Sequence, residues 1–136
     1  MYILAVDPGR EKCGLAVMRH DGKIFYQEVV ETARLSIKVS RLVREYQAEA
    51  LAIGDGTTSA TAQAAIKEAV PELKLAVLDE YRTTDEAKLR YWEKNHPRGW
   101  RRLLPTTLQS PPEPVDDYVA VILAERYFKK LCKKKA

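Results

Sequence analysis

Short apolar-rich runs and longer stretches with apolar residues at helical spacing alternate along this chain. Runs bounded by turn residues predict strands, and apolar positions repeating every three or four residues predict amphipathic helices. The runs predict strands at residues 2–6, 14–18, 24–29, 50–53 and 73–78. The helical spacing predicts a helix with a stripe of Leu35, Val39, Leu42, Val43 and Tyr46, a helix with Ala62, Ala65, Ile66 and Ala69, a helix from Thr83 or Thr84, and a helix over residues 115–131.

The turns between these segments indicate how the strands pair. Asp21 and Gly22 form a strong hairpin signal, so the first three strands are expected to form an antiparallel meander. Two strand–helix units follow, and their strands should run parallel to the first strand at the centre of the sheet. Thr83 and Glu86 have the spacing of a capping box at the third helix. The pattern predicts an α/β fold in which helices flank a mixed five-stranded sheet, a three-stranded antiparallel meander plus two parallel strands.

Length and composition narrow the class of protein. A chain of 136 residues that is 46% hydrophobic and 31% charged predicts a single globular domain over residues 1–136. No apolar run is long enough to cross a bilayer and there is no secretory start, so we expect no membrane partner. Cys13 and Cys132 lack the spacing of a metal site, which favours a cytoplasmic protein. The net charge of +4 permits an anionic partner without requiring one.

The first predicted strand is followed directly by a carboxylate, Asp7, whose backbone is restricted by the residues after it. Asp7 is followed by Pro8 and Gly9, so the chain turns sharply where a core strand leaves the sheet. An ionised carboxylate at that place is costly unless a cation or hydrogen-bond donors compensate it. An isolated Asp-Pro-Gly tripeptide more often only caps its own turn. The acids elsewhere in this chain favour the functional interpretation of Asp7.

More carboxylates are expected at the same edge of the sheet. The carboxyl ends of parallel strands meet at one edge, which brings Asp7 together with Asp55 and Glu80. Asp116 shares a helical face with apolar residues, so packing of the last helix should turn it inward; alternatively, Asp116 and Asp117 only complement the helix dipole. Acids that converge repel one another unless cations neutralise them, and ligands that are all oxygen favour Mg²⁺ or Mn²⁺.

Three motifs give the chain a family resemblance. The first reads Asp-x-Gly-x-x-Lys-x-Gly-x-Ala-Val from Asp7, the second Leu-Asp-Glu-Tyr-Arg-Thr-Thr from Leu78, and the third Val-Asp-x-x-Val-Ala-Val-Ile-Leu from Val115. Together they resemble the YqgF (RuvX) branch of the RNase H-like superfamily, relatives of the RuvC Holliday-junction resolvases, over nearly the whole chain. Tyr81 departs from the pattern, because the family usually has arginine directly after the glutamate.

This resemblance implies an RNase H-like fold and a metal-dependent nuclease. Asp7, Glu80 and Asp116 would be the catalytic residues and the ligands of two Mg²⁺ or Mn²⁺ ions, with Asp7 bridging them. The implied reaction is maturation of the 5′ end of precursor 16S ribosomal RNA, a step of ribosome biogenesis, so RNA is favoured over DNA. The alternatives are a Holliday junction resolvase acting as a dimer and a catalytically weak nucleic-acid-binding module. Asp55 is either a further ligand or a turn residue, and the turn interpretation is favoured.

Cations near the acids are candidates for contacts with nucleic acid. Lys12 and Arg82 flank the predicted carboxylates, although solvated surface cations are an equally good interpretation. Further along the chain, cations interleaved with aromatic side chains suit a single strand, which needs phosphate neutralisation and base stacking. The predicted nucleic-acid-binding residues are Lys12, Arg82, Arg98, Trp100, Arg101 and Arg102. Trp92 is expected in the core and His96 at the surface.

Overall fold

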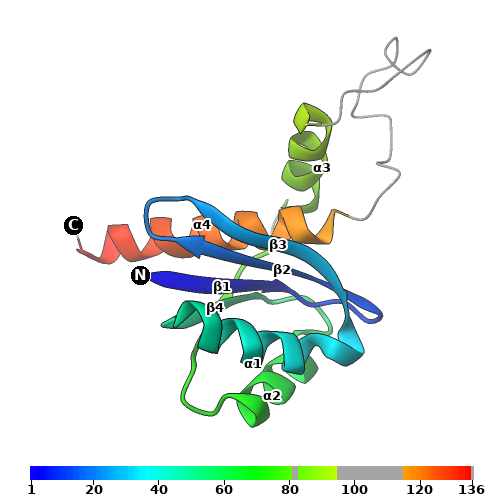
Figure 1. Ribbon diagram of the computed structural model, residues 1–136. Coiled ribbons are helices and arrows are strands. Elements are labelled where there is room, and N and C mark those ends of the chain that lie inside the picture. Colours follow the sequence, from blue (N-terminus) through cyan, green and yellow to red (C-terminus); the bar gives the residue numbers. More distant parts are fainter. Residues whose placement is uncertain (81–82, 95–114, 136) are drawn as a thin grey trace.

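A computed structural model describes residues 1–80, 83–94 and 115–135 of the chain (Figure 1). The strands are β1 (Tyr2–Asp7), β2 (Lys12–Arg19), β3 (Ile24–Glu31), β4 (Ala50–Gly54) and β5 (Lys74–Leu78). The helices are a short 3₁₀ helix η1 (Thr32–Arg34) and the α-helices α1 (Leu35–Tyr46), α2 (Ser59–Ala69), α3 (Thr83–Lys94) and α4 (Asp116–Lys135). Each strand and α-helix predicted from the hydrophobic pattern is present, with ends that differ by a few residues.

The strands form one mixed sheet in the order β3-β2-β1-β4-β5. β1 pairs antiparallel with β2, and β2 with β3, which confirms the predicted meander. β4 pairs parallel with β1, and β5 pairs parallel with β4. The expectation that all three parallel strands lie at the centre is wrong for β5, which is an outer strand of the sheet in the described residues. The second strand–helix unit adds its strand beyond β4 instead of inserting it between paired strands.

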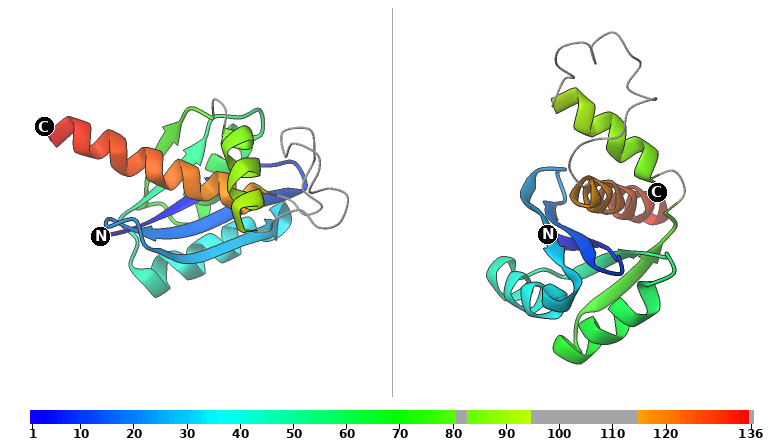
Figure 2. Two further views of the ribbon diagram at one scale, coloured as in Figure 1. Left: turned by 90° about the horizontal axis from the view of Figure 1, so that it is seen from above. Right: turned by 90° about the vertical axis from the view of Figure 1, so that its right-hand side faces the viewer.

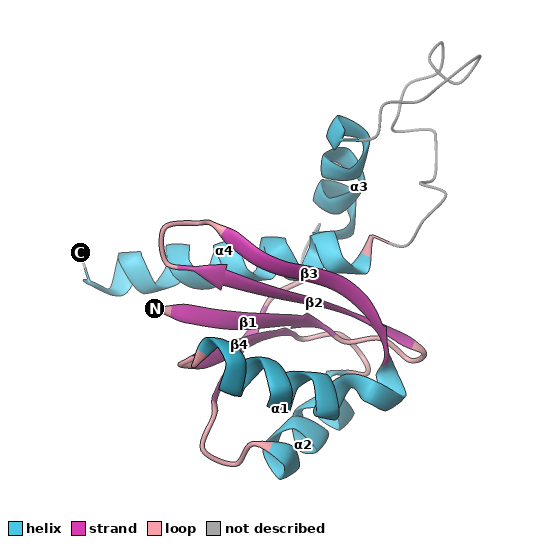
Figure 3. Ribbon diagram, viewed as in Figure 1, coloured by secondary structure: helices cyan, strands magenta, loops and turns pink. Residues whose placement is uncertain are grey.

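Helices cover both faces of the sheet, as Figure 2 and Figure 3 show. Successive side chains of a strand point to opposite faces. In β1, Leu4 and Val6 therefore pack in the cluster formed with α1 and α2, whereas Ile3 and Ala5 pack in the cluster formed with α4. α3 lies against the outer side of α4. In the described part of the chain, none of the helices has the length and apolar character needed to cross a bilayer.

Small side chains on the sheet allow α4 to pack closely against it. The sheet face that α4 covers carries buried alanines, namely Ala5, Ala16, Ala50 and Ala52. The apolar run of α4 is also buried, with Ile122 1% exposed and Leu123 0% exposed. Full burial of side chains of this size stabilises a fold by about 1.5–3 kcal/mol each. This packing fixes the position of the first turn of α4, where Asp116 lies.

Side-chain hydrogen bonds hold α3 and the end of β5 against α4. Arg90 of α3 donates two hydrogen bonds to Glu125 of α4, at 2.9 and 2.6 Å. Arg126 donates to the carbonyl oxygen of Asp79 at 2.9 Å. The chain directly before Glu80 is thereby tied to the same helix that carries Asp116.

The start of α3 differs from the expected capping box. The hydroxyl of Thr83 donates to the carbonyl oxygen of Glu80 at 2.8 Å, and Thr83 is buried. Glu86 instead lies 3.4 Å from the guanidinium of Arg126. The predicted Thr83–Glu86 capping box is therefore wrong, because a local hydrogen bond occupies the hydroxyl of Thr83 and a tertiary contact occupies the carboxyl of Glu86. The helix nevertheless begins at Thr83, one of the two expected positions.

Candidate active site

The turn that follows Asp7, the last residue of β1, is held by a small network. The hydroxyl of Thr32 donates to the carbonyl oxygen of Gly9 at 2.9 Å, and the amide of Gly9 donates to the sulfur of Cys13 at 3.5 Å. A Cβ atom at Gly9 would lie 2.1 Å from the carbonyl oxygen of Lys12, so glycine is required for the turn to close this tightly. Asp7 therefore leaves the sheet at a well-defined position.

Asp116 reaches Asp7 because β2 contains a glycine. Gly14 stands opposite Asp7 in the β1–β2 ladder. A Cβ atom at Gly14 would lie 1.7 Å from the carbonyl oxygen of Asp116, so the first turn of α4 contacts the strand backbone directly. Any larger residue at position 14 would push the helix away. As a result, the carboxyl groups of Asp7 and Asp116 lie within hydrogen-bond reach of each other.

Glu80 follows β5 and rests against two glycines at the end of β4 and just beyond it. A Cβ atom at Gly54 would lie 1.8 Å from Oε1 of Glu80, and a Cβ atom at Gly56 would lie 2.8 Å from Oε2. The side chain of Asp55 accepts a hydrogen bond of 3.2 Å from the backbone amide of Glu80. The Glu80 carboxyl is thus held against the sheet edge, within hydrogen-bond reach of Asp7.

The three carboxyl groups share an unfavourable electrostatic environment. Burial, and then the charges of Glu80 and Asp116, raise the pKa of Asp7 to about 8. Burial also raises the pKa of Glu80, with the charge of Asp55 acting in the same direction. The pKa of Asp116 is raised by burial and by the charge of Asp117. At neutral pH this cluster must keep a proton or bind a cation.

The carboxyl cluster has the ligand chemistry of a site for hard divalent cations. Its donors are oxygen atoms, which Mg²⁺ and Mn²⁺ prefer. Among the described residues, none gives the buried Oε1 of Glu80 a hydrogen bond, a costly state for a polar atom unless a further group binds it. Within residues 1–80, 83–94 and 115–135, no three Asp, Glu, His or Cys side chains converge on a single ion position. Asp7 instead lies within hydrogen-bond reach of Glu80 and of Asp116.

Two further acids lie beside the cluster and face other groups. Gln27 of β3 donates a hydrogen bond of 3.0 Å to Asp117, which therefore turns toward β3. Asp55 is exposed and accepts the backbone hydrogen bond described above, as a turn residue would. Asp116 is thus the acid of α4 that lies beside Asp7. The metal-binding and catalytic roles of Asp7, Glu80 and Asp116 stay predictions.

The structure describes only some of the predicted contacts with nucleic acid. Lys12 is exposed at the start of β2. Its positive charge partly opposes the rise in the pKa of Asp116, so a cation does lie near the acids. Trp92 is only 7% exposed, which confirms its expected place in the core. The remaining candidates lie outside the described residues, as does His96, and they are Arg82, Arg98, Trp100, Arg101 and Arg102.

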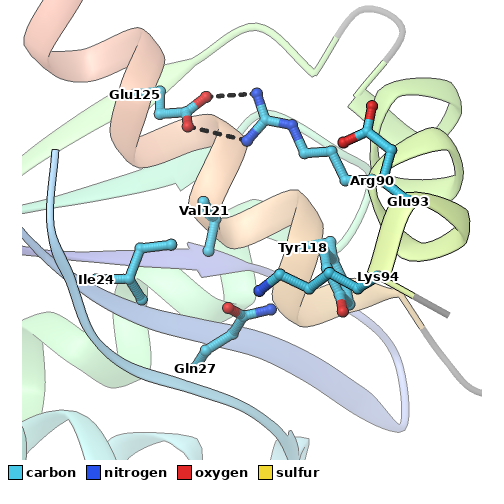
Figure 4. Close-up of a pocket in the computed structure, with 8 residues that line it drawn as sticks. All are labelled: Ile24, Gln27, Arg90, Glu93, Lys94, Tyr118, Val121 and Glu125. Atoms are coloured by element: carbon cyan, nitrogen blue, oxygen red, sulfur yellow. Dashed lines mark hydrogen bonds and ion pairs between the residues drawn. The ribbon is translucent and has the colours of Figure 1, made fainter.

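A cleft of about 460 Å³ lies between β3, α3 and α4, and Figure 4 draws residues that line it. The ion pair of Arg90 and Glu125 forms part of its wall. The ammonium of Lys94 lies 5.8 Å from the centre of the Tyr118 ring, within the range of a cation–π contact. Glu93 contributes a second acid to the lining. The two cations and two acids of this lining balance, so the cleft has little net charge with which to attract a polyanion.

Comparison with solved structures identifies the fold. RuvC from Thermus thermophilus is similar with a TM-score of 0.62 and 17% sequence identity, and the match covers 96% of each chain. RuvC from T. thermophilus in complex with a Holliday junction substrate gives a TM-score of 0.61 with 16% identity and the same coverage. At this low identity the likeness concerns the fold, and it confirms the RNase H-like architecture expected from the sequence.

Comparison at the sequence level identifies the family. No curated protein matches the chain. The family described as the Tex protein YqgF-like domain matches residues 1–88. This range includes Asp7, Gly14 and Glu80, together with the glycines that hold Glu80 in place. The match extends over more than half of the sequence and agrees with the YqgF resemblance of the motifs, and the chain therefore belongs to the family of Tex protein YqgF-like domains.

Proposed function

We propose that this protein is a metal-dependent nuclease that hydrolyses phosphodiester bonds. The observation that carries the proposal is the cluster of Asp7, Glu80 and Asp116, in which burial and mutual repulsion raise the pKa of the central acid to about 8. Placing three partly buried acids together destabilises a fold, so a purely structural role for them is disfavoured. Titratable groups with strongly shifted pKa values at the carboxyl edge of a sheet are candidates for a functional site.

Each acid of the cluster has a separate proposed role as a metal ligand. Asp7 would contribute oxygen ligands to both of two ions, Glu80 to one of them and Asp116 to the other. Bound Mg²⁺ or Mn²⁺ supplies a water of lowered pKa and neutralises the charge on the leaving oxygen. Close packing against glycine backbone holds Glu80 and Asp116 in position, so little rearrangement is needed when a substrate binds. Lys12 is placed to contact a phosphate of the bound strand.

For the substrate we propose RNA, with maturation of the 5′ end of precursor 16S ribosomal RNA in the cytoplasm as the reaction. The resemblance of the three motifs to YqgF proteins supports this choice. The positive net charge of +4 is compatible with a nucleic-acid substrate.

Holliday junction resolution is the second candidate. It is favoured by the likeness to RuvC over 96% of the chain, since one of these RuvC structures is in complex with a Holliday junction substrate. A resolvase needs two active sites related by symmetry, so this function requires a stable dimer. Measuring the oligomeric state of the purified protein, free and with a four-way junction, separates this candidate from the first.

A cleavage assay on three substrates tests the proposed activity. The substrates are a precursor ribosomal RNA fragment, a single strand of the same sequence as DNA, and a four-way junction, each with Mg²⁺, with Mn²⁺ or with a chelator. We expect metal-dependent cleavage with RNA preferred, and a loss of at least about 10³-fold in the Asp7→Asn variant, as for removal of a catalytic group. Turnover like that of the wild type in Asp7→Asn would overturn the mechanism and favour a nucleic-acid-binding module without catalysis.

Asp117→Asn is the matched control for Asp116→Asn. Both substitutions remove one charge from the first turn of α4, but only Asp116 faces Asp7, whereas Asp117 accepts a hydrogen bond from Gln27. We expect Asp116→Asn to lose cleavage and Asp117→Asn to keep most of it. A larger loss in Asp117→Asn would mean that the wrong acid of α4 has been assigned to the site.

A further inference from the structure

A second cleft, of about 420 Å³, opens at the same edge of the sheet on the side covered by α1 and α2. One of its walls is the turn at Gly9, which follows Asp7 by two residues. Another wall includes Thr58, which follows Gly56 by two residues, and Gly56 is one of the two glycines that contact the carboxyl group of Glu80. Two residues of chain span at most about 7 Å. The cleft therefore adjoins the carboxyl cluster from two directions.

The inner surface of this cleft is apolar. Leu35 and Ala62 close its bottom and are 2% and 7% exposed, so the accessible apolar surface comes from Ala33 and Ala65, which are both exposed. Ala65 lies one helical turn beyond Thr61 on the exposed side of α2 and completes the lining there. A ligand with a flat apolar face would cover this surface and release water from it.

The rim of the cleft, in contrast, carries hydrogen-bonding side chains that pair with nothing in the part of the chain that the structure describes. Among the described residues, the hydroxyls of Ser36, Thr58 and Thr61 make no side-chain hydrogen bond, and Arg10 makes no ion pair. A hydroxyl can donate or accept, so it can pair with either kind of group on a ligand. The guanidinium of Arg10 is exposed beside the turn after Asp7 and suits a phosphate.

We propose that this cleft binds the base of one unpaired nucleotide next to the bond that is cleaved; the proposal rests on the nuclease function above. The base lies on the apolar surface of Ala33 and Ala65, the hydroxyls of Thr58 and Thr61 contact its edge, and Arg10 contacts the adjoining phosphate. Rotatable hydroxyls accept the edges of different bases, so the site selects an unpaired nucleotide rather than a sequence. A base within a duplex has its edge occupied and its faces stacked, so it does not enter. The substrate class is thereby narrowed to strands that are single-stranded beside the cleavage site.

The two neighbouring alanines of α2 provide a matched pair of variants. Ala64 and Ala65 are both exposed, but only Ala65 lines the cleft. The substitution Ala65→Phe fills the cleft, while Ala64→Phe adds the same side chain outside it. Each is combined with Asp7→Asn, so that binding is measured without cleavage. The probes are short fluorescent RNA and DNA single strands, intact or with one abasic position that is moved along the strand.

We expect Ala65→Phe to weaken binding of the intact strand about tenfold, which is about 1.4 kcal/mol, and Ala64→Phe to leave it unchanged. With the protein that carries only Asp7→Asn, one abasic position should weaken binding by a similar factor, and Ala65→Phe should abolish that position's effect. Equal binding by the two phenylalanine variants, or an abasic penalty that survives in Ala65→Phe, would overturn the inference. If a protein with Asp7 intact cleaves equally well with and without Ala65→Phe, the inference about the cleft fails and the nuclease function stands. If binding depends on the cleft but the wild type cleaves none of the strands, only the nuclease function is refuted.

Discussion

We expect the substitution Asp7→Asn to stabilise the metal-free protein at alkaline pH. In the folded protein the pKa of Asp7 is about 8, against an ordinary value of 3.8 for the unfolded chain. At about 1.4 kcal/mol per pKa unit, ionising Asp7 beside Glu80 and Asp116 costs the folded state at most about 6 kcal/mol. Asparagine keeps the size of the side chain and removes its charge. The repulsion between the remaining acids and the burial of a polar side chain at position 7 persist, so only part of this free-energy cost is removed. We therefore expect a gain of about 1–3 kcal/mol, the usual penalty of a buried polar group without a compensating partner.

The sign of the pH dependence follows from proton binding. Between about pH 4 and pH 8 the folded wild type keeps the proton of Asp7 while the unfolded chain releases it, so stability falls as the pH rises through this window. Below pH 4 both states are protonated and the penalty is absent. Urea unfolding of the wild type and of Asp7→Asn in the presence of a chelator should therefore give curves that nearly meet at about pH 4 and separate most above pH 8.

Adding Mg²⁺ at pH 8 should reverse the order of the two proteins. A cation that binds the folded carboxyl cluster stabilises the wild type in proportion to the logarithm of its concentration, and it should have little effect on Asp7→Asn. Two curves that stay parallel from pH 4 to pH 9, or the same response to Mg²⁺ in both proteins, would refute the reasoning about the charge of Asp7.

Three further predictions concern the glycines and the predicted nucleic-acid contacts. Gly14→Ala should cost about 1–3 kcal/mol in thermal unfolding and abolish cleavage, because the added methyl group would overlap the backbone at Asp116. Gly54→Ala should cost less stability, since only the side chain of Glu80 must move, but turnover should fall about 10²-fold because a ligand is misplaced. The third prediction concerns the replacement of Arg98, Arg101 and Arg102 by alanine. It should weaken binding of a single strand and reduce the dependence of the binding constant on salt, a log–log slope, by about 0.7 per lost phosphate contact, with no change in Tm. An unchanged salt slope, or a large fall in Tm, would contradict the last of these.

The hydrophobic pattern was sufficient to predict the order of strands and helices and the antiparallel meander. These features follow from local chain properties, namely apolar periodicity and the turn at Asp21 and Gly22, which tertiary contacts did not override. The position of β5 was not predicted correctly, because no local signal states on which side of β4 the last strand pairs. The capping box at Thr83 did not form, because its hydroxyl donates to the carbonyl oxygen of Glu80 in the preceding turn and the carboxyl of Glu86 pairs with Arg126 on the distant helix α4.

The sequence also pointed to the acids that the fold brings together, but not to the glycines that allow it. Asp7 and Glu80 are recognisable because each follows a predicted strand, and Asp116 because it lies on the apolar face of a predicted helix. The role of Gly14 requires the register of β1 against β2 and the contact with α4, neither of which a single sequence reveals. Gly14 is the first residue of the predicted strand, and a glycine within a strand is a signal for close approach of another backbone.

The contact between Gly14 and the first turn of α4 also has a consequence for the time at which the site is formed. Asp7 and Asp116 are separated by most of the chain, so their meeting closes a very long loop, and contacts of that kind form late in folding. During synthesis the sheet strands leave the ribosome well before α4 does, and domains acquire structure from the N-terminal side first. Until α4 docks on the strand at Gly14, Asp7 lies at an open sheet edge without its partner from the helix. A chain that has not finished folding therefore lacks the complete carboxyl cluster, so the proposed nuclease activity would arise only once α4 has docked.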